Sequence, residues 1–433
     1  MRHTAQVLLS IIALAALGRA LAAPPPAREI DVRRAEAAGL RVIDGRYLRL
    51  VTDLPSSDAV DDLPAVFDAA VPLWAAYFGV KESQLARSRW TAFLIDDRER
   101  FAALDLLPAD NPNFVNGYAR DYELWLVEQP SDYYRRHLLL HEGTHGFMQT
   151  QLGGAGPGWY MEGMAELLGT HEWRNGRLRL NVIPPNRESV PMWGRVKIIR
   201  EAFAAKKVWP MEAVLAVDNT RALSTEHYAW TWALAALLDG HPAYQQRFRE
   251  LKTIVAADDF NDRFRKAFAK DWPELVAEWN AYVAQLDYGY DMQRMAIVHR
   301  PPNMASRPGR GALTINANRG WQATGWILMG GHSYQFTASG RFQIATDPDG
   351  TPWPCEPGGV IIEYHDGRPL GMLLGALRPT DGGPGNFATP VSIGVGATLR
   401  PDEDSFLYLR VNDNPAKLAD NAGELTIRIE RNN

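Results

Sequence analysis

Cysteine is nearly absent from this chain, which has only Cys355 among its 433 residues. A single thiol cannot form an intramolecular disulfide, so the fold must be held together by its hydrophobic core. A chain of this length can bury such a core and usually divides it between two or three domains. Cys355 is therefore expected to be a small, buried, apolar residue.

The chain also lacks a basic tract. Lys and Arg total 46 against 51 Asp and Glu, which gives a formal net charge of −5. Nucleic-acid-binding domains usually carry clustered positive charge, so no nucleic-acid partner is expected. A hydrophobic content of 46% with 22% charged residues is typical of a folded globular protein rather than a disordered one.

Long apolar runs are missing beyond the first 23 residues, MRHTAQVLLSIIALAALGRALAA. The apolar stretch from Val7 to Gly18 follows a short basic start and is short for a membrane span. Ala20 and Ala22 form the A-x-A pattern of a cleavage site, and a Pro-rich segment follows them. We predict a cleavable signal peptide over 1–22 and a secreted or periplasmic protein with no later transmembrane segment. An uncleaved membrane anchor is the alternative.

The composition changes near residue 300. Before it, helical patterns surround a few strand-like segments at 47–54, 90–97 and 122–127. After it, short alternating runs are separated by Gly, Pro, Asp and Asn, which is typical of a β-sandwich. The prediction is an α+β domain with a small sheet and many helices, followed by an all-β domain. The predicted segments are a signal peptide (1–22), a Pro-rich segment (23–39), the α+β domain (40–297), a linker (298–311) and the sandwich (312–433).

The strongest chemical signal is LLLHEGTHGFMQ at 138–149, within a helix predicted to begin after Ser131. His141 and His145 share one face of this helix because they lie four residues apart, and neutral imidazoles are good zinc ligands. Glu142 is turned about 100° around the helix, so it suits a general base better than a third ligand. The alternative is a chance occurrence on a helix face that carries polar residues.

A third ligand is predicted in GWYMEGMAELLG at 158–169. The turn-rich TQLGGAGPG before it allows a second helix to fold back on the first, and Glu162 and Glu166 share one face of that helix. Two carboxylates on an otherwise apolar helix are costly to bury without a cationic partner. The alternative is that both glutamates face solvent.

The H-E-x-x-H motif, the short gap and E-G-x-A-E together resemble the gluzincin zinc metallopeptidases, the group that includes thermolysin and aminopeptidase N-like enzymes. The likeness is greatest to their bacterial peptidase MA-like relatives. It covers roughly 40–290 and is specific over 138–169. The resemblance implies that Glu162 is the third zinc ligand and that Glu166 hydrogen-bonds a zinc-binding histidine.

In the aminopeptidase-like relatives, a tyrosine at the start of a later helix stabilises the oxyanion. HYAWTWALAALLDG at 227–240 resembles that pattern, which places Tyr228 in this role, although Trp230 and Thr231 replace small residues. His227 is the neighbouring candidate, and a tyrosine of the helix core is the alternative. The strand YELWLV at 122–127 is either the edge strand that binds extended peptide in these families or an ordinary internal strand.

The C-terminal segments GHSYQFTASGRF (331–342) and YLRVNDNPAKLADNAGELTIRI (408–429) resemble the calcium-dependent galactophilic bacterial lectin, a galactose-binding-like sandwich. The resemblance implies calcium ligands at Asp413, Asp420 and Asn421, whose oxygens suit that ion. Tight β-turns use the same residue types, and a non-binding sandwich is the alternative. Three tryptophans are either sugar-stacking or core residues: Trp321, Trp326 and Trp353.

The sequence thus predicts a secreted zinc metallopeptidase acting on peptide or protein, with Zn²⁺ as cofactor and Ca²⁺ as a second expected ion. Glu142 and Tyr228 are the expected catalytic residues. One alternative is a catalytically silent zinc protein whose sandwich binds carbohydrate. Another is a zinc hydrolase that acts on a non-peptide amide.

Overall fold

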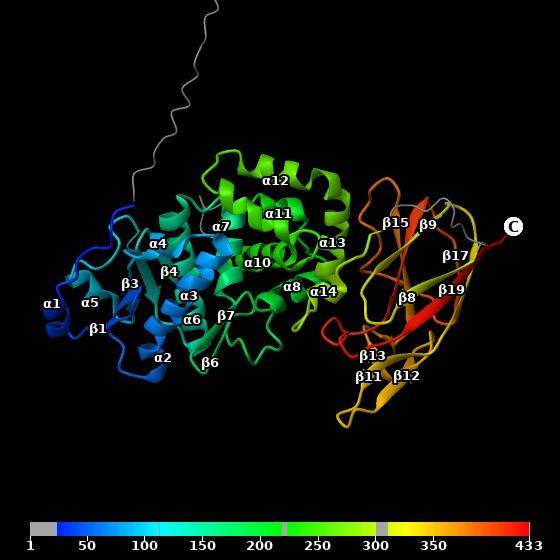
Figure 1. Ribbon diagram of the computed structural model, residues 1–433, viewed down its shortest axis with the longest axis horizontal. Helices are drawn as coiled ribbons and strands as arrows, with labels where there is room; N and C mark the ends of the chain where they lie inside the picture. Colours follow the sequence, from blue (N-terminus) through cyan, green and yellow to red (C-terminus); the bar gives the residue numbers. More distant parts are fainter. Residues whose placement is uncertain (1–23, 112, 219–222, 300–310, 433) are drawn as a thin grey trace, which may run out of the picture.

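The structure is a computed structural model that describes residues 24–111, 113–218, 223–299 and 311–432. A mixed helix and sheet part, coloured blue to yellow-green, is followed along the long axis by an all-β part coloured yellow to red (Figure 1). The predicted signal peptide and most of the predicted linker lie outside the described residues. Within those ranges, every helix is too short or too polar to reach across a lipid bilayer.

The first domain is built on a mixed five-stranded sheet in the order β1-β2-β3-β5-β4. Three central strands run parallel, and β1 and β4 pair antiparallel at the two edges. The predicted strands at 47–54, 90–97 and 122–127 are confirmed as β2, β3 and β5, whereas the two short edge strands were not predicted. The bounds are β1 (Arg41–Asp44), β2 (Leu48–Thr52), β3 (Trp90–Ile95), β4 (Gly117–Arg120) and β5 (Glu123–Val127).

Both faces of this sheet are covered, because β3 is buried along its whole length. Alternate residues enter two different cores, as the period of a strand requires. Leu94 packs in the large core with α3 (Leu63–Phe78) and α6 (Asp132–Phe147). Phe93 packs in a smaller core with α1 (Val32–Ala37) and α5 (Arg98–Ala103) on the other face.

The helix predicted to follow Ser131 is confirmed as α6. The Ser131 hydroxyl accepts a hydrogen bond from the Tyr134 amide at 3.0 Å and so caps the helix. A π-helical turn (Met148–Leu152) ends at Gly153, whose φ of 71° is a backbone conformation that favours glycine. The chain then reverses, as predicted, into α7 (Gly158–Gly169).

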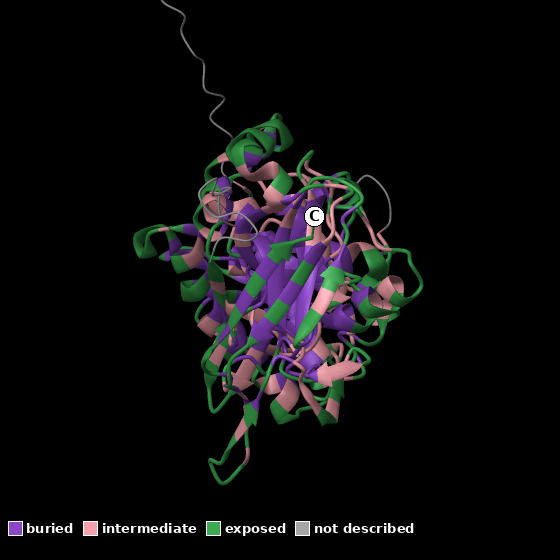
Figure 2. Cartoon of the chain, turned by 90° about the vertical axis from the view of Figure 1, so that its right-hand side faces the viewer, coloured by how far each residue is buried: buried purple, intermediate pink, exposed green. Residues whose placement is uncertain are grey.

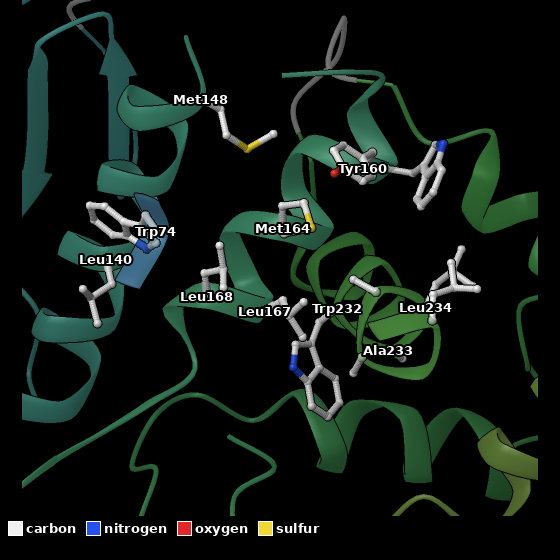
Figure 3. Packing of buried hydrophobic residues seen from close by; sticks show 14 of the residues in the cluster. Trp74, Leu140, Met148, Tyr160, Met164, Leu167, Leu168, Trp232, Ala233 and Leu234 are labelled. Atoms are coloured by element: carbon white, nitrogen blue, oxygen red, sulfur yellow. The ribbon is translucent and has the colours of Figure 1, made fainter. Parts of the chain in front are cut away.

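Helix α7 lies between α6 and α10 (Thr225–Gly240). Figure 3 shows Leu140 of α6 on one side of α7 and Trp232 of α10 on the other, with Met164 and Leu167 between them. All four side chains are buried. This apolar packing fixes the spacing of the two helices that carry the predicted metal ligands.

Shorter helices and one hairpin complete the first domain. The helices agree with the helical patterns that the sequence shows before residue 300. They are α2 (Asp58–Asp61), α4 (Glu82–Leu85), α8 (Arg195–Ala204), α9 (Met211–Leu215), α11 (Gln245–Glu250), α12 (Phe260–Phe268), α13 (Trp272–Gln285) and α14 (Met292–Met295). The hairpin consists of β6 (His171–Arg174) and β7 (Arg177–Leu180).

The second domain contains two four-stranded antiparallel sheets, in the orders β17-β10-β19-β8 and β16-β15-β18-β9. Residues from both sheets share one core, so the sheets pack face to face. Two hairpins lie beside them. The bounds are β8 (Ala312–Asn316), β9 (Gln322–Leu328), β10 (Tyr334–Ser339), β11 (Phe342–Thr346), β12 (Pro352–Cys355), β13 (Val360–His365), β14 (Arg368–Leu370), β15 (Leu373–Pro379), β16 (Val391–Ser392), β17 (Gly396–Leu399), β18 (Ser405–Val411) and β19 (Glu424–Arg431).

The sheet that carries the C-terminal strand β19 alternates buried and exposed residues along each strand, which Figure 2 shows as purple and green bands. One face of this sheet is therefore core and the other faces solvent. Cys355 is buried in the same core, as predicted from the sequence.

The two domains are in direct contact. Ala281 of α13 packs in one small core with Trp321 and Tyr408 of the second domain. In addition, Leu418 leaves the second domain and lies in the large core of the first, with 2% of its surface exposed. The Asp291 amide donates to the Pro415 carbonyl at 3.1 Å beside it.

Candidate metal centre

The three predicted zinc ligands converge on one point. The Nε2 atoms of His141 and His145 lie 3.1 Å apart, and Glu162 Oε2 lies 3.3 Å from the first and 3.4 Å from the second. All three side chains are buried. Each therefore offers one donor atom to a shared centre, two from α6 and one from α7, as the helical spacing predicted.

This donor set fits a divalent zinc ion. Two imidazole nitrogens and one carboxylate oxygen are ligands that zinc takes in catalytic sites. Glu162 Oε2 is buried without a hydrogen-bond donor among the described residues, so a cation would satisfy it. Burial opposes ionisation of Glu162, yet the neighbouring His145 and His141 outweigh it and lower its pKa to about 2. The carboxylate is thus held in the charged form that binds a metal.

Glu166 connects the centre to a buried arginine that the sequence did not reveal. Its carboxylate receives two hydrogen bonds from Arg195 of α8, Nε to Oε2 at 2.9 Å and Nη2 to Oε1 at 2.8 Å. The same carboxylate lies 3.4 Å from His141 Nδ1. Burial would raise the pKa of Glu166, but the Arg195 charge and the histidines lower it well below its ordinary value. Glu166 is thus positioned to accept the Nδ1 proton of His141, which leaves Nε2 free to bind a metal.

His137 also belongs to this network. Its Nδ1 lies 2.9 Å from the Gly169 carbonyl at the end of α7, and its Nε2 lies 3.5 Å from Glu166 Oε2. His137, His141 and Glu166 form a second group that could hold an ion. Because Arg195 already neutralises Glu166, the Glu162 group is the better candidate.

Glu142 lies beside the centre, in a pocket of about 650 Å³. Gly117 of the edge strand β4 lies against it, since a Cβ built on Gly117 would come within 2.2 Å of Glu142 Oε1. Burial raises the pKa of Glu142 above its ordinary value, and the nearby His141 and His145 only partly offset this. A carboxylate with a raised pKa is well suited to accept a proton near neutral pH.

Tyr228 reaches the same pocket from α10. Its ring lies 5.8 Å from the His141 ring and 5.7 Å from the guanidinium of Arg195. Burial raises the pKa of Tyr228 well above its ordinary value, so the hydroxyl stays protonated as a donor. His227, the neighbouring candidate, instead caps α10 through Ser224 and packs on Trp209, outside the pocket lining.

The strand at the edge of the sheet is β4, and β5 lies inside it. The prediction that YELWLV at 122–127 forms the edge is therefore wrong, and its alternative, an internal strand, is correct. Gly117 and Ala119 of β4 both line the pocket. The Val127 amide donates to the Asn116 carbonyl, so alternate pairing directs the backbone groups of Gly117 and Ala119 away from β5.

The predicted calcium ligands converge only in part. Asn421 Nδ2 donates to Asp413 Oδ2 at 2.8 Å, but Asp420 turns its carboxylate to the Thr346 amide at 3.1 Å. Asn421 Oδ1 is buried without a donor among the described groups. Burial raises the pKa of Asp413 to about 6, although Asn421 and Asn414 donate to it. Calcium binding by this loop stays a prediction.

The tryptophans considered for sugar stacking are mostly core residues. Trp321 and Trp326 are buried, with 1% and 3% of their surfaces exposed, and Trp353 is half-buried on β12. Of these three, only Trp353 presents part of its ring to solvent. The structure therefore gives no surface on which these side chains together could bind a sugar.

Comparisons with known proteins leave the family of the chain open. No family model matches the sequence. None of the curated proteins matches it either. Among solved structures, the chain is similar to one described as "EclA N-terminal domain; PllA-like lectin", at 20% identity and a TM-score of 0.21. The match covers 28% of this chain and 95% of that one, and its TM-score is too low to assign a fold family or a ligand. The gluzincin relationship stays a prediction.

Proposed function

We propose that this chain is a secreted zinc-dependent metallopeptidase of the gluzincin type. One observation supports it above all: His141 Nε2, His145 Nε2 and Glu162 Oε2 lie within 3.4 Å of one another in an accessible pocket, with Glu142 beside them. Zinc bound there would act as a Lewis acid and favour ionisation of the attacking water.

The protein groups around this centre have distinct roles in the proposal. Glu142 accepts a proton from the attacking water and later delivers it to the leaving amine. The Tyr228 hydroxyl, kept protonated by burial, donates a hydrogen bond to the oxyanion that forms on the scissile carbonyl. Glu166 and Arg195 hold His141 in the required tautomer.

The substrate would bind as an additional strand beside β4. The outward backbone groups of Gly117 and Ala119 can pair with an extended peptide, and both residues line the pocket that contains Glu142. A peptide on this edge would lie next to the base and the metal ligands. Extended peptide, rather than a compact small molecule, is therefore the substrate that the pocket favours.

Metal content tests the proposal directly. Wild-type protein should carry one zinc per chain by mass spectrometry, and a chelator should abolish cleavage of a peptide library. His141→Ala should lose both the zinc and the cleavage, because only two of three ligands remain. His332→Ala, in a turn of the second domain, is the matched control and should retain both. A wild-type protein that binds no zinc at micromolar concentration, or binds it without cleaving any peptide, contradicts the proposal.

Gly117→Ala should lower activity without loss of metal. The added methyl would fall 2.2 Å from Glu142 Oε1, and the flexible carboxylate must move away while the fold is kept. Displacement of a catalytic group by about 1 Å can cost about 100-fold in rate, so kcat/KM should fall about 10- to 100-fold. Gly358→Ala is the control, since its nearest atom would be 3.5 Å away. Unchanged kcat/KM in Gly117→Ala would show that Glu142 does not act from this position.

A further inference from the structure

A second cavity, of about 420 Å³, lies between the two domains and away from the metal centre. The first domain lines it with residues of α8 and α13, among them Arg200 and Gln285, and with Asp287. The second domain contributes Arg368 of β14 and Arg410 of β18. Positively charged side chains from both domains therefore meet around one space.

Arg410 is a buried cation that forms no ion pair with the residues that the structure describes. It is 3% exposed, and no carboxylate of the described chain lies within ion-pairing distance of it. Its guanidinium donates to Gln285 and, at 3.4 Å, to the Asp413 carbonyl, while its Nε has no acceptor among the described residues. Burial lowers the pKa of Arg410 to about 10, which still leaves the group charged at neutral pH. Such a charge is costly to bury unless an anion accompanies it.

Arg368 adds a second positive charge to the same cavity. Its guanidinium donates to Ser392 Oγ at 3.2 Å and to the carbonyls of Pro390 and Asp366, none of which is an anion. The positive charge of Arg368 lowers the pKa of Arg410, in addition to the effect of burial. Two arginines that repel each other across one cavity are stabilised by a shared anion.

The acidic residues of the cavity do not supply this anion. Asp287 is already paired with Arg200. Asp366 favours the charged form of Arg410 from a distance but forms no ion pair with it, and its mostly exposed carboxylate lies 3.4 Å from His365. The positive charges of Arg368 and Arg410 therefore remain without an ion pair from the described part of the chain.

We propose that this interdomain cavity binds an oxyanion, a carboxylate or a phosphate, through Arg410 and Arg368. Leu374, Phe387 and Leu286 also line the cavity, so it has room and apolar contacts for a small organic anion as well as for inorganic phosphate. Because both domains contribute to the cavity, the bound anion joins them.

Thermal unfolding of the full-length chain tests this inference. Inorganic phosphate, acetate and glucuronate are titrated separately at constant ionic strength, with chloride as the reference salt. At least one of them should raise Tm saturably, since a ligand of the folded state alone stabilises it by mass action. Saturation by phosphate or by a carboxylate identifies which oxyanion the cavity prefers. Arg410→Met and Arg368→Gln should each weaken the apparent affinity by about tenfold or more.

Two controls keep the outcome decisive. Phosphate also stabilises proteins non-specifically by exclusion from their surface, and that effect does not saturate and is equal in all variants. Arg341→Met removes an exposed arginine of the second domain and should leave the affinity unchanged. If Arg410→Met fails to fold, the half-exposed Arg368→Gln still decides the result. Equal Tm shifts in the wild type and Arg368→Gln, or no saturable shift with any of the three anions, overturn the inference.

Discussion

Glu142→Gln should retain zinc and lose peptide hydrolysis almost completely. The amide fills the same space beside His141 and His145 but cannot accept the proton of the attacking water. General base catalysis of this kind contributes about 10²- to 10⁴-fold, so kcat should fall by that factor. Burial raises the pKa of Glu142, so the base is lost in the wild type as pH falls through that raised pKa. The acidic limb of the wild-type pH–rate profile should therefore be absent in the residual activity of Glu142→Gln.

A matched control separates this effect from general damage. Glu226→Gln changes an exposed glutamate in the first turn of α10, near Tyr228 in sequence but outside the pocket lining. It should keep both the zinc and the wild-type kcat. If Glu142→Gln cleaves the same peptides at the wild-type rate, Glu142 is not the base. If it also loses its zinc, the residue acts on the metal rather than on the water.

Arg195→Met should be the most destabilising single change near the centre. Both Arg195 and Glu166 are buried, with 3% and 1% exposed, and removal of the arginine leaves a buried carboxylate without its main partner. Breaking a buried ion pair in this way costs about 3–5 kcal/mol of unfolding free energy. Denaturant unfolding of the metal-free protein measures the loss. Zinc affinity should fall about 10- to 100-fold, because His141 is no longer held by Glu166 in one orientation.

The double variant Arg195→Met with Glu166→Gln distinguishes an ion pair from simple packing. Removing both charges together should recover at least half of the lost stability, since neither charge is then left alone. Lys197→Met is the control on the same helix, because its ion pair with Glu201 is exposed and should contribute less than about 1 kcal/mol. Strictly additive losses in the double variant would mean that the pair contributes only through packing.

The sequence predicted the metal ligands because their spacing follows the helical period. His141 and His145 lie four apart on α6, and the turn before α7 brings Glu162 to the same side. No helical spacing connects Arg195 to the metal ligands in the sequence. This arginine reaches Glu166 from a helix that begins at Arg195 itself, and nothing in its neighbouring residues distinguishes it from a surface arginine. His137 shares the face of His141, so the four-residue spacing could have assigned it to the network.

The edge strand was misassigned for a different physical reason. β4 has four residues, begins with a glycine and is half-buried throughout, so it lacks both the length and the alternation that mark a strand. The neighbouring β5 is mostly apolar and gives the clearer strand pattern, so the edge position was assigned to it instead of to β4. In the second domain, the pattern of Asp and Asn residues predicted a calcium loop, but it could not show that Asp420 turns toward the Thr346 amide.

Leu418 has a consequence for how this protein could have been assembled. The side chain belongs to a loop of the second domain and is buried in the core of the first, where the Pro415 carbonyl also binds the Asp291 amide. The two domains therefore share core residues and are not independent modules joined only by a linker. Replacing the second domain by an unrelated one would leave a cavity in the core of the first domain where Leu418 packs. An exchange of domains during evolution must therefore have replaced this loop together with the residues that surround Leu418.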